Sequence, residues 1–187
     1  MNLKRHCDLC DYQKINLQKG DLCGVTNKKP SFNKTCTSID FGDKLLDELE
    51  EVLVDYEYLK LNKKKIYNSF ISGSIIGVFL LICGYLVFDY FFNDEYRVSF
   101  DKGPRAFFNY IAFLIIVSGS FIITGFLFTK KAIINFLYHK KQLIETENNI
   151  SEIDEVLNLY NQKYKYNINF DKEIHGIQEV EIDIELI

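Results

Sequence analysis

"FISGSIIGVFLLICGYLVF", residues 70–88, is a stretch of nineteen residues without a charged side chain. A second uncharged stretch, "AFFNYIAFLIIVSGSFIITGFLF", covers the twenty-three residues 106–128. At about 1.5 Å of rise per residue, each is long enough to cross a hydrocarbon layer of roughly 30 Å as an α-helix. A buried helical pair in a soluble protein is the alternative, but the chain has too little other apolar material to cover two such helices. The sequence therefore predicts two transmembrane helices.

Lysine and arginine residues near the two stretches predict the orientation in the membrane. Eight lysines flank the stretches on the side of the chain ends, and three cations lie in the connecting loop. The eight are Lys60, Lys63, Lys64, Lys65, Lys130, Lys131, Lys140 and Lys141, and the three are Arg97, Lys102 and Arg105. The first ten residues lack the apolar stretch of a signal peptide, so the first helix is expected to act as an internal anchor. We predict a multi-pass protein of the inner (cytoplasmic) membrane with both termini in the cytosol.

Four cysteines lie within the first thirty-six residues, at Cys7, Cys10, Cys23 and Cys36. Structural disulfides are rare in the reducing cytosol, and the two-residue gap between the first pair allows both thiolates to reach one ion. Four sulfur ligands would form a closed, structural zinc site with no position for water. An iron or redox site, and free or disulfide-bonded thiols, remain alternatives. His6 is a possible substitute ligand, although we expect it to be a solvated histidine.

The string "KGDLCGVTNKKPSFNKTC", residues 19–36, carries a pattern of turn residues between the cysteines. Its recurring elements are Gly20, Cys23, Thr26, Pro30 with Phe32, and Cys36. With the leading Cys-x2-Cys, this string resembles the cysteine-rich, zinc-ribbon-like head of small bacterial two-helix membrane proteins. The resemblance covers about the first forty residues, implies a compact metal-bound head and names no activity.

Apolar residues continue at helical spacing outside both uncharged stretches. Residues 43–66 repeat them at Leu45, Leu49, Val52, Tyr56, Leu59 and Ile66. Residues 130–165 repeat them every seven residues at Phe136, Leu143, Ile150, Leu157 and Tyr164, with Ile153 and Tyr160 at the intermediate positions. Such three-four spacing predicts an antiparallel coiled-coil stalk in the cytosol, and pairing with a second subunit is the rival interpretation.

Residues at equal depth are expected to have numbers that sum to about 198, twice the midpoint of the loop between the two stretches. Leu45 then faces Ile153 in the stalk. Small residues face each other in the membrane, Gly73 opposite Gly125 and Ser69 opposite Thr129, where they permit close backbone approach.

The chain ends in "VEIDIEL", residues 180–186, in which apolar and acidic residues alternate. This alternation predicts a β-strand. We expect the strand to dock on the cysteine-rich head in a small mixed sheet, with residues 166–170 as a neighbour; addition to the sheet edge of a partner protein is the alternative. The predicted domains are the head 1–42, stalk helix 43–66, transmembrane helix 67–92, extracytoplasmic loop 93–105, transmembrane helix 106–129, stalk helix 130–165 and acidic tail 166–187.

The sequence contains none of the motifs that mark an active site, such as HExxH or a phosphate-binding glycine loop. The head also has too few basic residues to predict nucleic-acid binding. We therefore predict a non-enzymatic, mainly α-helical membrane protein whose partners are the lipid bilayer and either another protein or a second copy of the chain. Its head and stalk would recruit or position the partner. The alternatives are an oligomerising membrane pore of a bacterial defence or toxin system, and an immunity or regulatory subunit for a membrane-acting toxin.

Overall fold

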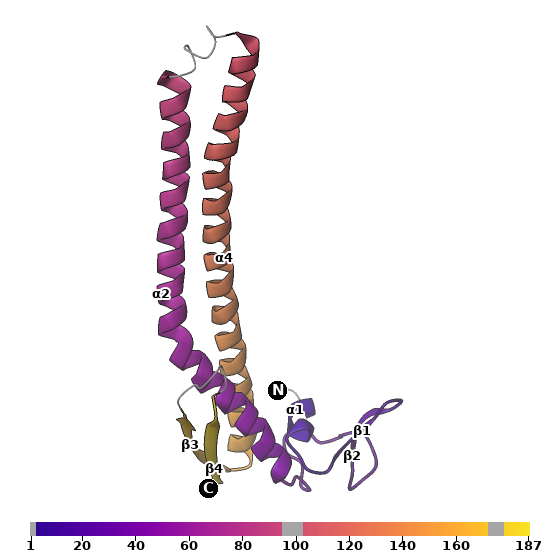
Figure 1. The fold of residues 1–187 in the computed structure, drawn as a ribbon. Coiled ribbons are helices and arrows are strands. Elements are labelled where there is room, and N and C mark those ends of the chain that lie inside the picture. The colour runs from indigo at the N-terminus through magenta and orange to yellow at the C-terminus, as the bar shows by residue number, and fades with distance from the viewer. Residues whose placement is uncertain (1–2, 95–102, 172–177) are drawn as a thin grey trace. The chain divides into compact units, whose positions relative to one another are not determined.

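The computed structural model describes residues 3–94, 103–171 and 178–187, and within them the protein is mainly helical (Figure 1). Two long helices, α2 (Asp43–Asp94) and α4 (Pro104–Leu159), contain the two uncharged stretches. The short helix α1 (Leu3–Asp8) and the strands β1 (Gln13–Asn16) and β2 (Gly20–Cys23) precede them. The strands β3 (Tyr164–Phe170) and β4 (Val180–Leu186) follow. The two predicted long apolar helices and the C-terminal strand are confirmed, whereas most of the predicted loop 93–105 lies outside the described residues.

The chain divides into two compact units. The first, which we name the head unit, comprises residues 1–61 and 142–187. The second, which we name the hairpin unit, comprises residues 62–141. The units are described separately below.

The head unit has a hydrophobic core contributed by α2, by α4 and by Leu9, which follows α1. Its buried members are Leu9, Leu45, Leu49, Val52, Leu53, Ile153, Val156 and Leu157. Leu45 and Ile153, the pair expected to face each other, are both fully buried in this cluster. Leu53 and Val156 were not expected there, and their burial gives each helix a wider apolar face than a two-position coiled-coil seam needs.

Helix α1 is joined to this core by packing and by charge. Leu9, just beyond its end, is fully buried. The Arg5 guanidinium lies 2.9 Å from a Glu48 carboxylate oxygen on α2 and 3.8 Å from one of Glu152 on α4. The cysteine-rich segment is therefore anchored to both long helices within the head unit.

The predicted position of the C-terminal strand is partly wrong. β4 pairs with β3 in antiparallel register, with Tyr166 opposite Ile184 and Ile168 opposite Ile182, so residues 166–170 are indeed its neighbour. The strands of the cysteine-rich segment, β1 and β2, form a separate two-stranded sheet, and β4 does not join it. The apolar face of the β3–β4 sheet instead packs on the helical core through residues such as Ile168, Ile182 and Ile184, which is how an isolated strand pair becomes stable in water.

The second stalk helix ends six residues earlier than predicted, at Leu159 rather than residue 165. Asn161 adopts a left-handed backbone conformation with φ of 54°. The Gln162 N–H then donates to the Leu157 carbonyl at 3.0 Å, and the Asn161 N–H donates to the Asn158 carbonyl at 3.3 Å. This is the Schellman arrangement that closes a helix, here with asparagine where glycine is more common.

In the hairpin unit the two helices lie side by side and antiparallel, but their register differs from the expected one (Figure 1). A Cβ added to Gly125 would lie 2.7 Å from the Gly77 carbonyl oxygen, and one added to Gly73 would lie 3.0 Å from the Ala132 Cβ. Gly125 therefore faces Gly77 and not Gly73, a shift of one helical turn. This stagger brings backbone against backbone at Gly77 and Gly125, and it also places Gly84 against the Ser118 carbonyl.

The outward surface of the hairpin unit is apolar. Large side chains such as Ile75, Phe79 and Ile116 are each more than 60% exposed. Both helices are long and apolar enough to cross a membrane, and only 11% and 17% of their most apolar windows are buried inside the molecule. A core helix of a soluble protein would be mostly buried by its own chain, and these helices are not.

Candidate metal centre

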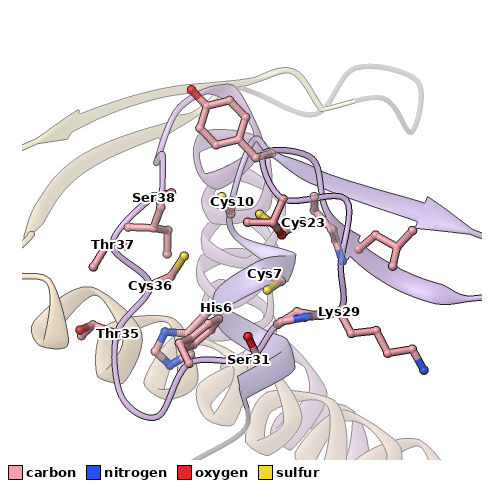
Figure 2. A pocket seen from close by; sticks show the side chains of 17 residues that line it. His6, Cys7, Cys10, Cys23, Lys29, Ser31, Thr35, Cys36, Thr37 and Ser38 are labelled. Carbon is pink, nitrogen blue, oxygen red and sulfur yellow. The ribbon is translucent and has the colours of Figure 1, made fainter.

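The four N-terminal cysteines reach one cavity from different elements. Cys7 lies on α1, Cys10 follows that helix, Cys23 ends β2, and Cys36 lies in the loop that leads to α2. All four line a cavity of about 280 Å³ in the head unit, and Figure 2 shows their sulfur atoms gathered around it. The structure thus brings together every residue that the sequence proposed as a ligand. The fifth cysteine, Cys83, lies in the hairpin unit.

Tight turns hold two of these cysteines. The Cys10 N–H donates to the Cys7 carbonyl at 3.1 Å, which folds the Cys-x2-Cys segment back on itself. Cys23 donates to the Lys28 carbonyl at 2.9 Å and accepts from the Asn27 N–H at 2.7 Å. Gly24 follows Cys23 with no room for a side chain, because an added Cβ would lie 2.7 Å from the Tyr12 carbonyl oxygen. Close packing therefore requires a glycine at this position beside Cys23.

The electrostatics differ between the thiols. Burial, followed by repulsion from the neighbouring Cys10, Cys36 and Cys23, raises the pKa of Cys7 to about 11. Hydrogen bonds from the backbone N–H groups of Thr26 and Val25 lower the pKa of Cys23. These interactions show that the four sulfurs are close enough to repel one another when ionised. A cation among them would favour the thiolate forms that the site otherwise disfavours.

The thiols as placed do not form a coordination sphere. All five cysteines are free, and within the described residues no three His, Cys, Asp or Glu side chains lie close enough together to hold an ion. Four zinc–sulfur bonds of about 2.3 Å need a much smaller space than this cavity. The donor chemistry fits a zinc ion, and the sulfurs would have to move inward to bind one.

His6 lies beside the thiols, and its expected solvation is wrong: its side chain is fully buried. Its Nδ1 lies 3.1 Å from the Tyr160 hydroxyl, which also accepts the Cys36 N–H at 2.7 Å. Its ring packs 5.4 Å from that of Phe32. Nε2 is buried without a hydrogen-bond partner, and burial lowers the pKa of the ring.

Tyr160 is the residue of this site that sequence reasoning missed. It follows the last residue of α4, and its hydroxyl joins the Cys36 loop and His6 to that helix. Its position in the apolar repeat predicted a packing role only. Tyrosine carries a hydroxyl that needs a partner when buried, and this requirement was the available indication of a polar contact.

Comparison with known proteins finds no relative of this chain. No protein-family model, no curated protein and no solved structure matches the chain. The assignment of a role depends on the chain's own chemistry.

Proposed function

We propose that the protein is an integral membrane protein in which residues 67–92 and 106–129 cross the bilayer. The observation that supports this proposal is the exposure of large apolar side chains along both helices of the hairpin unit, among them Ile75, Phe79 and Ile116. In water these side chains would drive aggregation, whereas in lipid they need no cover. The lysine distribution favours the inner membrane with both chain ends in the cytosol.

Two cysteine-labelling positions test insertion and orientation together. In intact cells, a membrane-impermeant maleimide should label the variant Ser99→Cys in the connecting loop. It should label the matched variant Ser151→Cys, at an exposed position of α4 in the head unit, only after permeabilisation. Labelling of residue 151 in intact cells would contradict the orientation, and release of the chain by a carbonate wash would contradict insertion.

In this proposal the four thiols of the head unit bind one structural zinc ion. Cys7, Cys10, Cys23 and Cys36 would hold it, and the ion would supply a cross-link between α1, β2 and the Cys36 loop. The four thiols line one cavity, which supports this part of the proposal.

Elemental analysis of the purified chain tests the zinc site with an internal control. We expect about one zinc per chain in the parent protein and in Cys83→Ser, because that cysteine lies in the other unit. Cys7→Ser or Cys36→Ser should lose most of the metal. A parent protein that is metal-free after purification without chelators would contradict the proposal.

The head unit would then act as a non-enzymatic interaction module on a membrane anchor, with residues 43–66 and 130–159 as its stalk. It has a buried hydrophobic core of its own, which supports a body that is stable in water and can position a cytosolic partner. Membrane-potential measurements in cells that overproduce the chain separate this role from a pore. An anchor leaves the potential unchanged, and depolarisation would favour the pore.

A further inference from the structure

The described part of the hairpin unit carries seven lysines, on segments of α2 and α4 (residues 62–88 and 103–141) that contain no Asp or Glu. The lysines are Lys63, Lys64, Lys65, Lys130, Lys131, Lys140 and Lys141, and all are exposed. The sequence has no Asp or Glu between Glu57 and Asp89 or between Asp101 and Glu145. Among the ion pairs of the described residues, none involves Lys130 or Lys131. Lys130 and Lys131 therefore present positive charge that no ion pair among the described residues neutralises.

Contacts between the two helices place these lysines at two levels. Gly73 lies against Ala132, so Lys131 is level with Ser74, inside the uncharged stretch of α2. The Phe70 and Phe136 rings stack with centroids 4.7 Å apart. By the same register, Lys63–Lys65 lie level with Lys140 and Lys141.

We name Lys130 and Lys131 the upper tier and the other five lysines the lower tier. Ten residues separate Lys130 from Lys140, which corresponds to about 15 Å along a helix. By the same register, the upper tier is level with Ser74 and with Ile75, whose side chain is exposed.

The surface between the tiers combines large apolar and aromatic side chains with small polar ones. Its exposed large apolar side chains are Tyr67 and Ile71 on α2 and Ile133, Ile134, Leu137 and Tyr138 on α4. The polar side chains of Asn68, Ser69, Ser72 and Asn135 are exposed among them. Tyrosine is enriched where a membrane protein crosses the lipid–water boundary, because its ring is apolar and its hydroxyl is polar. A ligand for this surface needs negative charge beside the lysines and apolar chains beside the isoleucines. A nucleic acid or an acidic soluble protein supplies the first but not the second.

We infer that residues 62–141 bind anionic phospholipids, whose phosphate groups lie between the two lysine tiers. The inference rests on the membrane insertion proposed above. The upper-tier lysines extend their flexible side chains from the apolar region toward the phosphates, and the lower tier meets the phosphates from the aqueous side. Each lysine near an anionic surface contributes about 1 kcal/mol of attraction.

Native mass spectrometry of the full chain in detergent, titrated with phosphatidylglycerol or phosphatidylcholine, tests the inference. The parent protein should prefer phosphatidylglycerol. The double variant Lys130→Gln with Lys131→Gln should bind that lipid about 30-fold more weakly, which is the combined effect of two lysines. The matched double variant Lys163→Gln with Lys165→Gln, in the head unit, should change binding less than about 2-fold.

Other outcomes distinguish a failure of this inference from a failure of the proposed membrane insertion. A chain that carbonate releases from membranes fails the proposed insertion. A chain that stays in the membrane but binds both lipids equally, or an upper-tier variant that keeps the full preference, overturns the lipid site alone. Loss of phosphatidylglycerol in the presence of an equal concentration of inorganic phosphate or duplex DNA would also overturn it, because the apolar contacts would then contribute nothing.

Discussion

The head unit buries large apolar side chains of α2, whereas the hairpin unit leaves large apolar side chains of the same helix exposed. In the head unit Leu45, Leu49 and Leu53 on α2 are buried by α4 and by the β3–β4 sheet. Further along the same helix, Ile75 and Phe79 are 63% exposed. The head-unit part of α2 carries many charged residues between its leucines, whereas residues 70–88 carry none. Burial distinguishes a core that the chain itself covers from an apolar surface that the chain leaves exposed. The following predictions test that contrast.

The largest expected effect comes from removing a core side chain. Leu49→Ala should lower the free energy of unfolding of the head unit by about 3 kcal/mol, because Leu49 is fully buried and its loss leaves a cavity. Ile75→Ala in the hairpin unit is the matched control, since a side chain on the outer surface leaves no cavity. Urea denaturation of the detergent-solubilised chain, followed by protease resistance of the head unit, measures the difference. Equal costs for the two variants would mean that the contrast in burial is wrong.

Close backbone contact in the hairpin unit gives the next effect. Gly125→Leu should destabilise the packing of α2 against α4 by about 2 kcal/mol, because the new side chain collides with the Gly77 carbonyl. Gly119→Leu adds the same side chain where no atom lies within 4 Å and should be neutral or stabilising. Thermal unfolding in detergent, monitored by circular dichroism, distinguishes them. The register predicted from sequence alone would make Gly73 the partner, so Gly77→Leu and Gly73→Leu should also differ.

A smaller effect is expected at the link between α4 and the cysteine-rich segment. Tyr160→Phe should cost about 1.5 kcal/mol, because the Cys36 N–H and the buried His6 Nδ1 both lose their partner. Tyr166→Phe is the control, since its hydroxyl is exposed and lies 3.5 Å from Glu57. Hydrogen exchange at residues 30–40 should increase in the first variant only. An unchanged exchange pattern in Tyr160→Phe would show that the link does not hold the loop.

The smallest effect is a dependence on alkaline pH. Burial, followed by the nearby Asp154 carboxylate, raises the pKa of Tyr164 in the folded chain. The unfolded tyrosine loses its proton first, near pH 10, so stability should fall as the pH rises above that value. Tyr164→Phe should make the fall shallower between pH 9 and 11, as measured by urea midpoints. The quantity to compare is the slope of stability against pH in the parent chain and in Tyr164→Phe. A constant difference in stability between the two at all pH values would not count against the prediction.

Much of the fold follows from local patterns in the sequence. The uncharged stretches predicted two long helices, the alternation of residues 180–186 predicted the last strand, and the cysteine spacing selected the four thiols that share one cavity. Each pattern depends on neighbours along the chain, where helix and strand periods fix which side chains share a face. Early closure of α4 at Asn161 escaped prediction because asparagine enters the left-handed conformation less often than glycine.

By itself, the sequence determined which segments are apolar enough for a membrane, where the charges lie and which segment neighbours the last strand. Only the tertiary structure decided that the β3–β4 pair packs on the helices apart from the β1–β2 sheet, that His6 is buried, and that Gly77 faces Gly125. These outcomes depend on contacts between residues far apart in the chain. Local propensity is the same for neighbouring registers one turn apart, so packing energy at the small residues selects among them.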